Sequence, residues 1–211
     1  IRAPKVTQAK EIYERVANIA RGAALMTDTQ VEILFDGGCS DLIPNSALSQ
    51  VLYHNLKTIG PPRFDERDRL VAKEFGATLS AQEKLSDIRQ NKALEEKVLA
   101  DVINPYFEVS EVLAASSDVG DVSWVVPSAQ CFVACAAVGT QGHSWQFTAQ
   151  AKTSAAHKGM LTAGKILAAT SIELIENPAV IEAAKKELEE RLGATAYESP
   201  VPMSYQSKRS Q

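Results

Sequence analysis

Two kinds of hydrophobic period alternate along this chain, and their order constrains the fold more than any other feature. From residue 6 to residue 26 the apolar positions recur at helical spacing, which predicts one amphipathic helix. The next apolar run, VEILF at residues 31–35, alternates like a half-buried strand. Because the first residues also look like the end of a strand, this order is typical of a small α/β layer. We therefore expect an α/β fold.

A change in backbone stiffness then divides the chain. Gly37 and Gly38 relax the backbone and Pro44 fixes it, so this stretch suits a hinge or a domain crossing. Beyond the crossing we expect, in order, helices over residues 46–59 and most of 63–108, buried strands within 112–128 and 129–139, a long helix from about Ser154, and a last helix from Pro178 to about Leu192.

The charge and the cysteines narrow the class of protein. A formal net charge of -4 and a pI near 5.5 argue against a nucleic-acid-binding protein, which needs a concentrated basic surface. No apolar run reaches the roughly 18 to 20 residues of a membrane span. The first residues lack the pattern of a signal peptide, and the sequence does not start with methionine. We expect the chain to begin partway through a longer protein. Cys39, Cys131 and Cys135 lack metal-ligand spacing, which favours buried free thiols in the cytoplasm.

Two predicted loops carry candidate chemistry. Asp118 and Asp121 lie where one strand is expected to run into a loop, and His143 follows the next strand. Ligands gather beyond strand ends in open α/β sheets, so both loops can face one crevice. Carboxylate and imidazole together are ligands that a zinc-like ion prefers. On the pattern alone, however, a structural loop histidine is the more frequent explanation.

Longer strings add a family resemblance that runs from Arg2 to about Gly193. The strings RAPKVTQAKEIYERVANIARGAALMTDTQVEILFDGGCSDLIPN, GPPRFDERDRLVAKEF, SSDVGDVSWVVPSAQCFVACAAVGTQGHSWQ and AHKGMLTAGKILAAT resemble the co-catalytic zinc aminoacylase and carboxypeptidase family. The resemblance implies that residues 1–40 are the C-terminal half of a βαβ dimerisation (lid) domain. Residues 41–211 would be the C-terminal part of a mixed-sheet catalytic domain.

The same resemblance implies a site with two divalent ions, zinc or manganese, in the full-length subunit. His143 in GHSWQ matches a family metal ligand, against the alternative of an ordinary loop histidine. Asp118 and Asp121 would contact the substrate or orient a ligand, or else cap a strand or face solvent. Trp145 would line the pocket or pack in the core. The early ligand motifs and the catalytic glutamate are absent here. No catalytic residue is therefore expected in this chain, which alone should be inactive.

The implied reaction is hydrolysis of N-acyl amino acid amides such as p-aminobenzoyl-glutamate. The implied partner is a second copy or a paralogous subunit, with no nucleic acid and no membrane. The alternative is a non-catalytic subunit or binding module that keeps the fold without a complete metal site.

Overall fold

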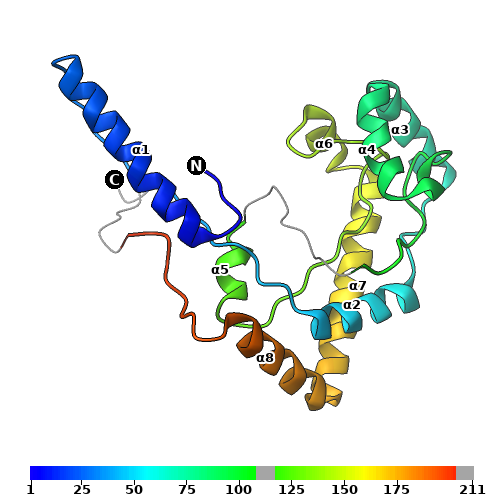
Figure 1. Ribbon diagram of the computed structural model, residues 1–211. Helices are drawn as coiled ribbons and strands as arrows, with labels where there is room; N and C mark the ends of the chain where they lie inside the picture. Colours follow the sequence, from blue (N-terminus) through cyan, green and yellow to red (C-terminus); the bar gives the residue numbers. More distant parts are fainter. Residues whose placement is uncertain (108–116, 203–211) are drawn as a thin grey trace. The chain divides into compact units, whose positions relative to one another are not determined.

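The computed structural model describes residues 1–107 and 117–202, which divide into two compact units. Unit 1 comprises Ile1–Asn45, Val109–Ser128 and Ala184–Gln211, and unit 2 comprises Ser46–Glu108 and Ala129–Ala183. Figure 1 labels the α-helices of the described part, which are α1 (Val6–Met26), α2 (Ser46–Ile59), α3 (Glu66–Ala77), α4 (Ala81–Gln90), α5 (Val119–Ser123), α6 (Trp145–Gln150), α7 (Ser154–Glu176) and α8 (Pro178–Leu192). A 3-10 turn, η1 (Lys92–Leu94), follows α4.

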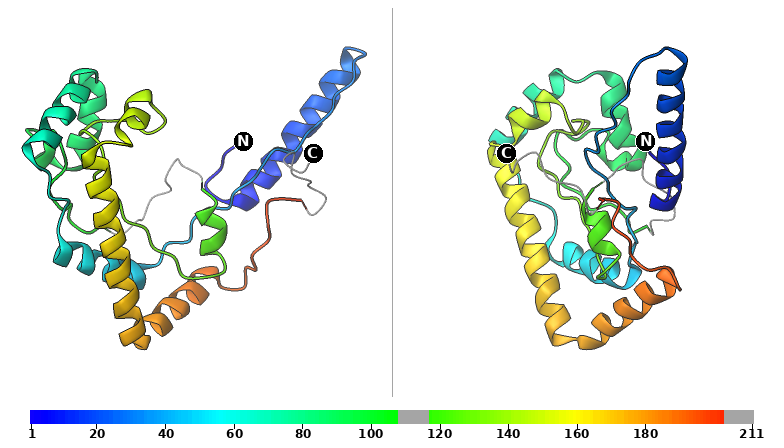
Figure 2. Two further views of the ribbon diagram at one scale, coloured as in Figure 1. Left: turned by 180° about the vertical axis from the view of Figure 1, so that it is seen from behind. Right: turned by 90° about the vertical axis from the view of Figure 1, so that its left-hand side faces the viewer.

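Unit 2 is organised around the long helix α7. Helix α2 packs against α7 in the views of Figures 1 and 2, and Asn55 Nδ2 donates to Glu173 Oε2 at 2.6 Å. Near the start of α7 the core contains Leu99, which is fully buried. Its buried neighbours come from α3, from the segment after α5 and from α7: Ala72, Ala137 and Ala155. The small side chains allow these elements to approach closely.

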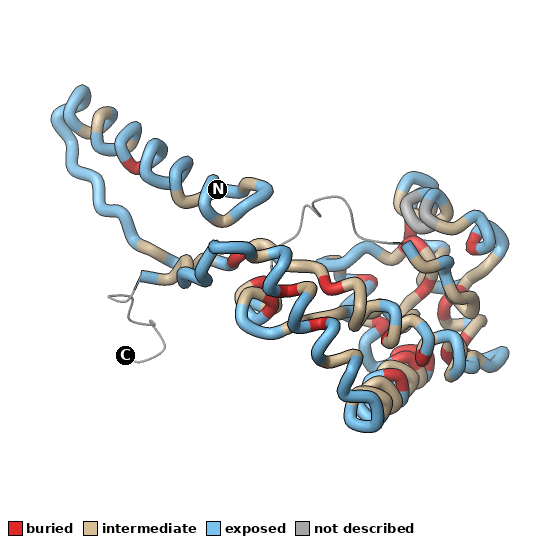
Figure 3. Tube along the Cα trace, turned by 60° about the horizontal axis from the view of Figure 1, so that its bottom comes forward, coloured by how far each residue is buried: buried red, intermediate tan, exposed pale blue. Residues whose placement is uncertain are grey.

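Polar contacts from α5 and its C-cap residue Trp124 join separate segments of unit 1. The Ser123 hydroxyl, fully buried, accepts from the Ile43 amide at 2.8 Å, and the Trp124 indole donates to the Asp41 carbonyl at 2.8 Å. Helix α1 contributes little to this packing, because Ala17 is its one buried residue. Figure 3 shows the rest of α1 as intermediate or exposed. The predicted helix over residues 6–26 is confirmed, but the described residues of this unit do not cover its apolar face.

The expectation of an α/β fold with a mixed sheet is wrong. The described residues contain no strand, and their one isolated bridge joins Leu99 to Ala137. Residues 31–35 and 129–135 follow an extended course in Figure 1 but have no strand beside them among the described residues. Residues 119–123, within one predicted strand, form helix α5, and residues 108–116 lie outside the described part. Alternation of apolar residues indicates an extended chain, whereas a strand also needs a partner for its backbone groups.

The helix predictions were more successful, because the backbone hydrogen bonds of a helix are made within the helix itself. The predicted starts at Ser154 and Pro178 are confirmed, as are the bounds of α2. The division after residue 40 concerned the domains of a longer fold, and these two units do not test it. Among the described residues, none of the helices is both long and apolar enough to cross a membrane.

Candidate functional site

His143 lies in the loop between the buried residue Ala137 and helix α6. Its backbone has φ of 58°, in the left-handed region that non-glycine residues seldom adopt. Such strain persists only where the surrounding structure imposes it, and it is concentrated at functional sites. The His143 side chain is exposed and makes no hydrogen bond or ion pair with the residues that the structure describes. Its imidazole is therefore accessible to a ligand from outside the chain.

The residue after His143 fixes the end of this loop. Ser144 is the N-cap of α6, where its hydroxyl accepts from the Phe147 amide at 3.2 Å and donates to the Gln141 carbonyl at 2.7 Å. An N-cap hydroxyl satisfies a helix amide that otherwise lacks a partner. The backbone immediately following His143 is thus fixed to the start of α6.

Trp145, the first residue of α6, combines a packing contact with an exposed surface. Its ring centroid lies 6.4 Å from that of Phe75, and 61% of the residue is exposed. Contact with one aromatic ring orients the indole while leaving much of its surface accessible. The arrangement allows both interpretations of Trp145, so its role in substrate binding stays a prediction.

Asp118 and Asp121 lie on or beside helix α5, not at the end of a strand. Asp121 accepts from the Ser40 amide at 3.2 Å and the Ser40 hydroxyl at 2.6 Å. It also accepts from the Tyr197 hydroxyl at 3.0 Å. Burial and the Asp121 carboxylate raise the pKa of Tyr197. The Asp121 carboxylate therefore ties three segments of unit 1 together, while Asp118 is exposed at the start of α5.

The predicted site residues fall into two groups. Asp118 and Asp121 belong to unit 1, whereas His143 and Trp145 belong to unit 2, where the loop and α6 bring them together. In the described part of the chain, no three His, Cys, Asp or Glu side chains are close enough to hold a metal ion. Those residues thus offer His143 as a single accessible donor and do not form a complete metal centre.

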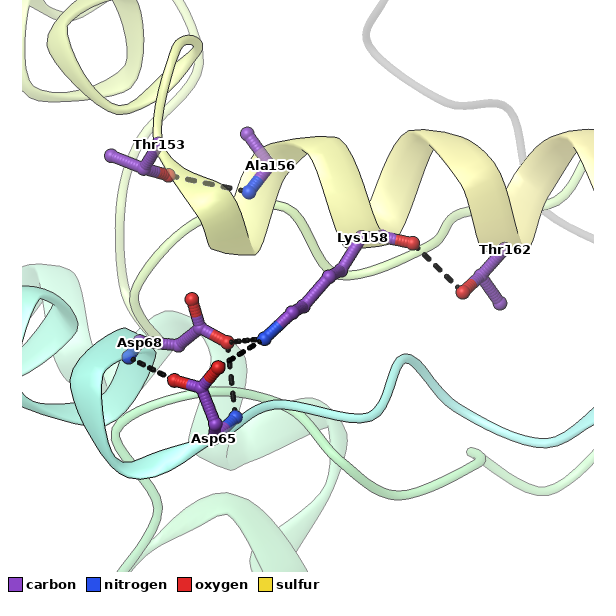
Figure 4. Close-up of polar contacts among 6 residues, drawn as sticks. All are labelled: Asp65, Asp68, Thr153, Ala156, Lys158 and Thr162. Atoms are coloured by element: carbon purple, nitrogen blue, oxygen red, sulfur yellow. Dashed lines mark hydrogen bonds and ion pairs between the residues drawn. The ribbon is translucent and has the colours of Figure 1, made fainter.

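Unit 2 contains an ionic cluster that the sequence analysis did not identify (Figure 4). Lys158 of α7 donates to Asp65 Oδ2 at 2.6 Å and to Asp68 Oδ2 at 2.5 Å. The side chain of Asp68 is 1% exposed, and that of Lys158 is 30% exposed. Asp65 and Asp68 also exchange side-chain hydrogen bonds with each other's amides at the start of α3. The sequence did contain a signal for the start of α3, because two acidic residues three positions apart can form a capping box.

The charges in this cluster stabilise one another. Hydrogen bonds from Lys158 and from the Asp68 amide lower the pKa of Asp65. Burial acts to raise the pKa of Asp68, but the bonds from Lys158 and the Asp65 amide outweigh it, so that pKa is also lowered. Bonds to Asp65 and Asp68 raise the pKa of Lys158. Lys158 therefore stays protonated at neutral pH and cannot serve as a general base.

We expect unit 2 to lose stability as the pH falls below about 4. An aspartate in the unfolded state has a pKa of about 3.9, above the lowered pKa values of Asp65 and Asp68 in the folded state. As the pH falls, the unfolded state therefore binds protons first. The stabilising contribution is complete above that unfolded pKa and disappears as the pH falls through the folded pKa values. Urea midpoints measured from about pH 6 down to about pH 3 should fall more steeply in wild type than in Lys158→Met. Parallel pH profiles would contradict this assignment.

The two cysteines of the extended segment are poor nucleophiles. Burial raises the pKa of Cys131 and of Cys135, so both thiols stay protonated at neutral pH. The Cys135 thiol also donates to the Val133 carbonyl at 3.1 Å. Both cysteines are free and half-buried, and Cys39 is free as well. The expected burial is wrong for Cys39, which is exposed. These contacts fit packing rather than covalent catalysis.

Comparison with known proteins gives one clear similarity. The chain is 41% identical over 214 residues to one of the subunits of p-aminobenzoyl-glutamate hydrolase from Escherichia coli (strain K12). The aligned region covers 96% of this chain and 44% of that protein, so the chain spans less than half the length of the relative. No protein-family model and no solved structure matches the chain. The similarity bears out the resemblance to a p-aminobenzoyl-glutamate hydrolase subunit, whereas the metal dependence that the resemblance implies stays a prediction.

Proposed function

We propose that this chain is the C-terminal part of a metal-dependent amidohydrolase that cleaves N-acyl amino acid amides such as p-aminobenzoyl-glutamate. The observation that carries the proposal is 41% identity over 96% of the chain to a protein whose name states both hydrolysis and that substrate. Identity at this level over so long a stretch supports a shared fold and related chemistry. The catalytic base and most metal ligands would come from a part of the protein outside this chain.

In this proposal His143 is one ligand of a site for two divalent ions, zinc or manganese. The support is an exposed imidazole without competing hydrogen bonds among the described residues, held on a strained backbone before a capped helix. Bound in such a site, zinc supplies the Lewis acidity that activates water for attack on an amide. His143 would contribute a neutral ring nitrogen and so must be deprotonated when it binds.

Three further residues are proposed to act around the substrate. Asp118 is exposed at the start of α5, and Asp121 holds that short helix against Ser40. Asp121 would thus act through the placement of Asp118 or through a direct contact. Trp145 presents an exposed indole two residues after His143, which suits stacking on an aromatic acyl group.

The proposal extends to assembly and location. The relative is named as a subunit, so we propose that the full-length protein associates with a second copy or with a paralogous subunit. Three free cysteines support a reducing compartment, and we propose the cytoplasm.

A second candidate is a non-catalytic subunit or binding module. The observation that favours it is the lack, within residues 1–107 and 117–202, of any three side chains able to hold a metal ion. The two candidates differ in what the full-length protein can do.

Chelation of the full-length protein distinguishes them. We expect the purified protein, with its partner subunit if it has one, to hydrolyse p-aminobenzoyl-glutamate. Treatment with a chelator should abolish this activity, and added zinc or manganese should restore it, because the water-activating ion is removed and returned. The present chain by itself should be inactive. Full activity after complete removal of metal would exclude the metal-dependent mechanism, whereas no activity with metal bound would favour the binding module.

A further inference from the structure

We infer that Gln150 is a positioning residue that holds the His143 loop in its ligand-presenting conformation. The inference rests on the proposed function, since it assigns Gln150 a role in metal binding through His143. Gln150 is the last residue of α6, and 3% of it is exposed. A buried amide of this kind needs partners for its polar atoms, and those found among the described residues are in the loop or in α6.

The Gln150 side chain bonds both ends of a four-residue turn. Its Oε1 accepts from the buried Ala137 amide at 2.8 Å. Its Nε2 donates to the Thr140 hydroxyl at 3.1 Å and to the Gln146 carbonyl at 3.1 Å. The turn itself is closed by the Thr140 amide, which donates to the Ala137 carbonyl at 3.0 Å. One side chain therefore fastens residues 137–140 to α6.

The turn is also anchored on its other side. The Val138 amide donates to the Val98 carbonyl at 3.0 Å, beside the bridge between Leu99 and Ala137. Gly139, at φ of 87°, lies against the backbone of Lys84, and a Cβ there would be 2.7 Å from the Lys84 Cα. The turn is thus confined between the core of unit 2 and the Gln150 amide.

These anchors define where His143 can be. Gln150 fixes the chain up to Thr140, and Ser144 fixes it again at the start of α6. Only Gln141, Gly142 and His143 lie between the two anchors. Ser144 caps the start of α6, and Gln150 is its last residue. The loop therefore enters α6 at one end, while its first residues are hydrogen-bonded to the other end. A three-residue span so constrained can impose the left-handed conformation at His143.

The test replaces Gln150 in the full-length protein with a side chain of similar length and no hydrogen-bonding amide. In Gln150→Met, the amides of residues 137–144 should exchange with deuterium at least about tenfold faster, because the turn loses its bonds to α6. The dissociation constant for zinc should rise about 10- to 100-fold, the range typical of residues that orient a ligand. Gln130→Met, at an exposed position, is the matched control and should change neither quantity.

The outcomes separate this inference from the proposed function. If His143→Ala weakens zinc binding but Gln150→Met leaves both the exchange rates and the zinc affinity unchanged, the positioning role is wrong and the proposed function stands. Faster exchange with unchanged zinc affinity also overturns the inference. If His143→Ala itself has no effect on zinc, the proposed function fails.

A second variant covers the case in which Gln150→Met unfolds unit 2. Thr140→Val removes one bond of the Gln150 amide and leaves the bond to Ala137. Exchange at residues 140–144 should then be faster by a factor of about three to ten, with α7 unchanged. Unchanged exchange in Thr140→Val would contradict the inference.

Discussion

Gly159→Ala is expected to destabilise unit 2 by about 2 kcal/mol or more, within the range for adding a methyl group to a closely packed site. Gly159 is buried on α7, where a Cβ would overlap the carbonyl oxygen of Ala134 and touch the Cys135 sulfur. The obstacle is backbone, which cannot rotate away as a flexible side chain could. Helix α7 would have to move off the extended segment that leads to the His143 loop.

The same helix provides the matched control. Apart from its own stretch of α7, none of the described atoms lies within 4 Å of the position that a Cβ at Gly164 would take. Gly164→Ala should therefore stabilise α7 by up to about 1 kcal/mol, because alanine loses less backbone entropy in a helix. Urea unfolding can be followed by Trp145 fluorescence in a Trp124→Phe background, so that the signal reports on unit 2. Effects of the same sign at the two glycines would contradict the close packing at Gly159.

Lys158→Met should produce the second large loss of stability. It removes the cation that bonds Asp68, whose side chain is 1% exposed, and leaves that carboxylate buried without its counter-charge. Breaking one side of a buried pair costs about 3 kcal/mol, because the remaining charge keeps its desolvation penalty. The link between α3 and α7 drawn in Figure 4 would be lost as well.

Lys186 allows the same substitution at an exposed ion pair. Its Nζ lies 3.7 Å from Glu190 Oε1, with both side chains largely exposed. Lys186→Met should change the unfolding free energy by less than about 0.5 kcal/mol, as exposed pairs usually do. If Lys158→Met proves as mild as this control, the cluster is not a significant link between α3 and α7.

The helices were accessible to sequence reasoning because their signals are local. Helical spacing placed α1 at residues 6–26, and Pro178 at a first-turn position marked the start of α8. The strands failed for the converse reason. Residues 129–136 have the apolar composition of a buried strand, but nothing in that composition says whether a partner is present.

In the candidate site, too, the residue with a local signal was predicted and the residues with distant partners were not. His143 stood out because a histidine after an apolar run is rare in this chain, and its strained backbone supports the interest in it. Gln150 and the ion pairs of Lys158 could not be predicted, since the contacts of a glutamine or lysine on a helix depend on distant partners. Their partners Ala137 and Asp68 lie 13 and 90 residues away along the chain.

Metal bound to the full-length protein is the most direct measure of the role assigned to His143. We expect His143→Ala to lose at least about 100-fold in zinc affinity, more than the loss of a ligand's supporting partner would cause. His54→Ala, at an exposed position on α2, is the matched control and should retain the affinity of the wild type. Equal zinc stoichiometry and affinity in wild type and His143→Ala would contradict the account.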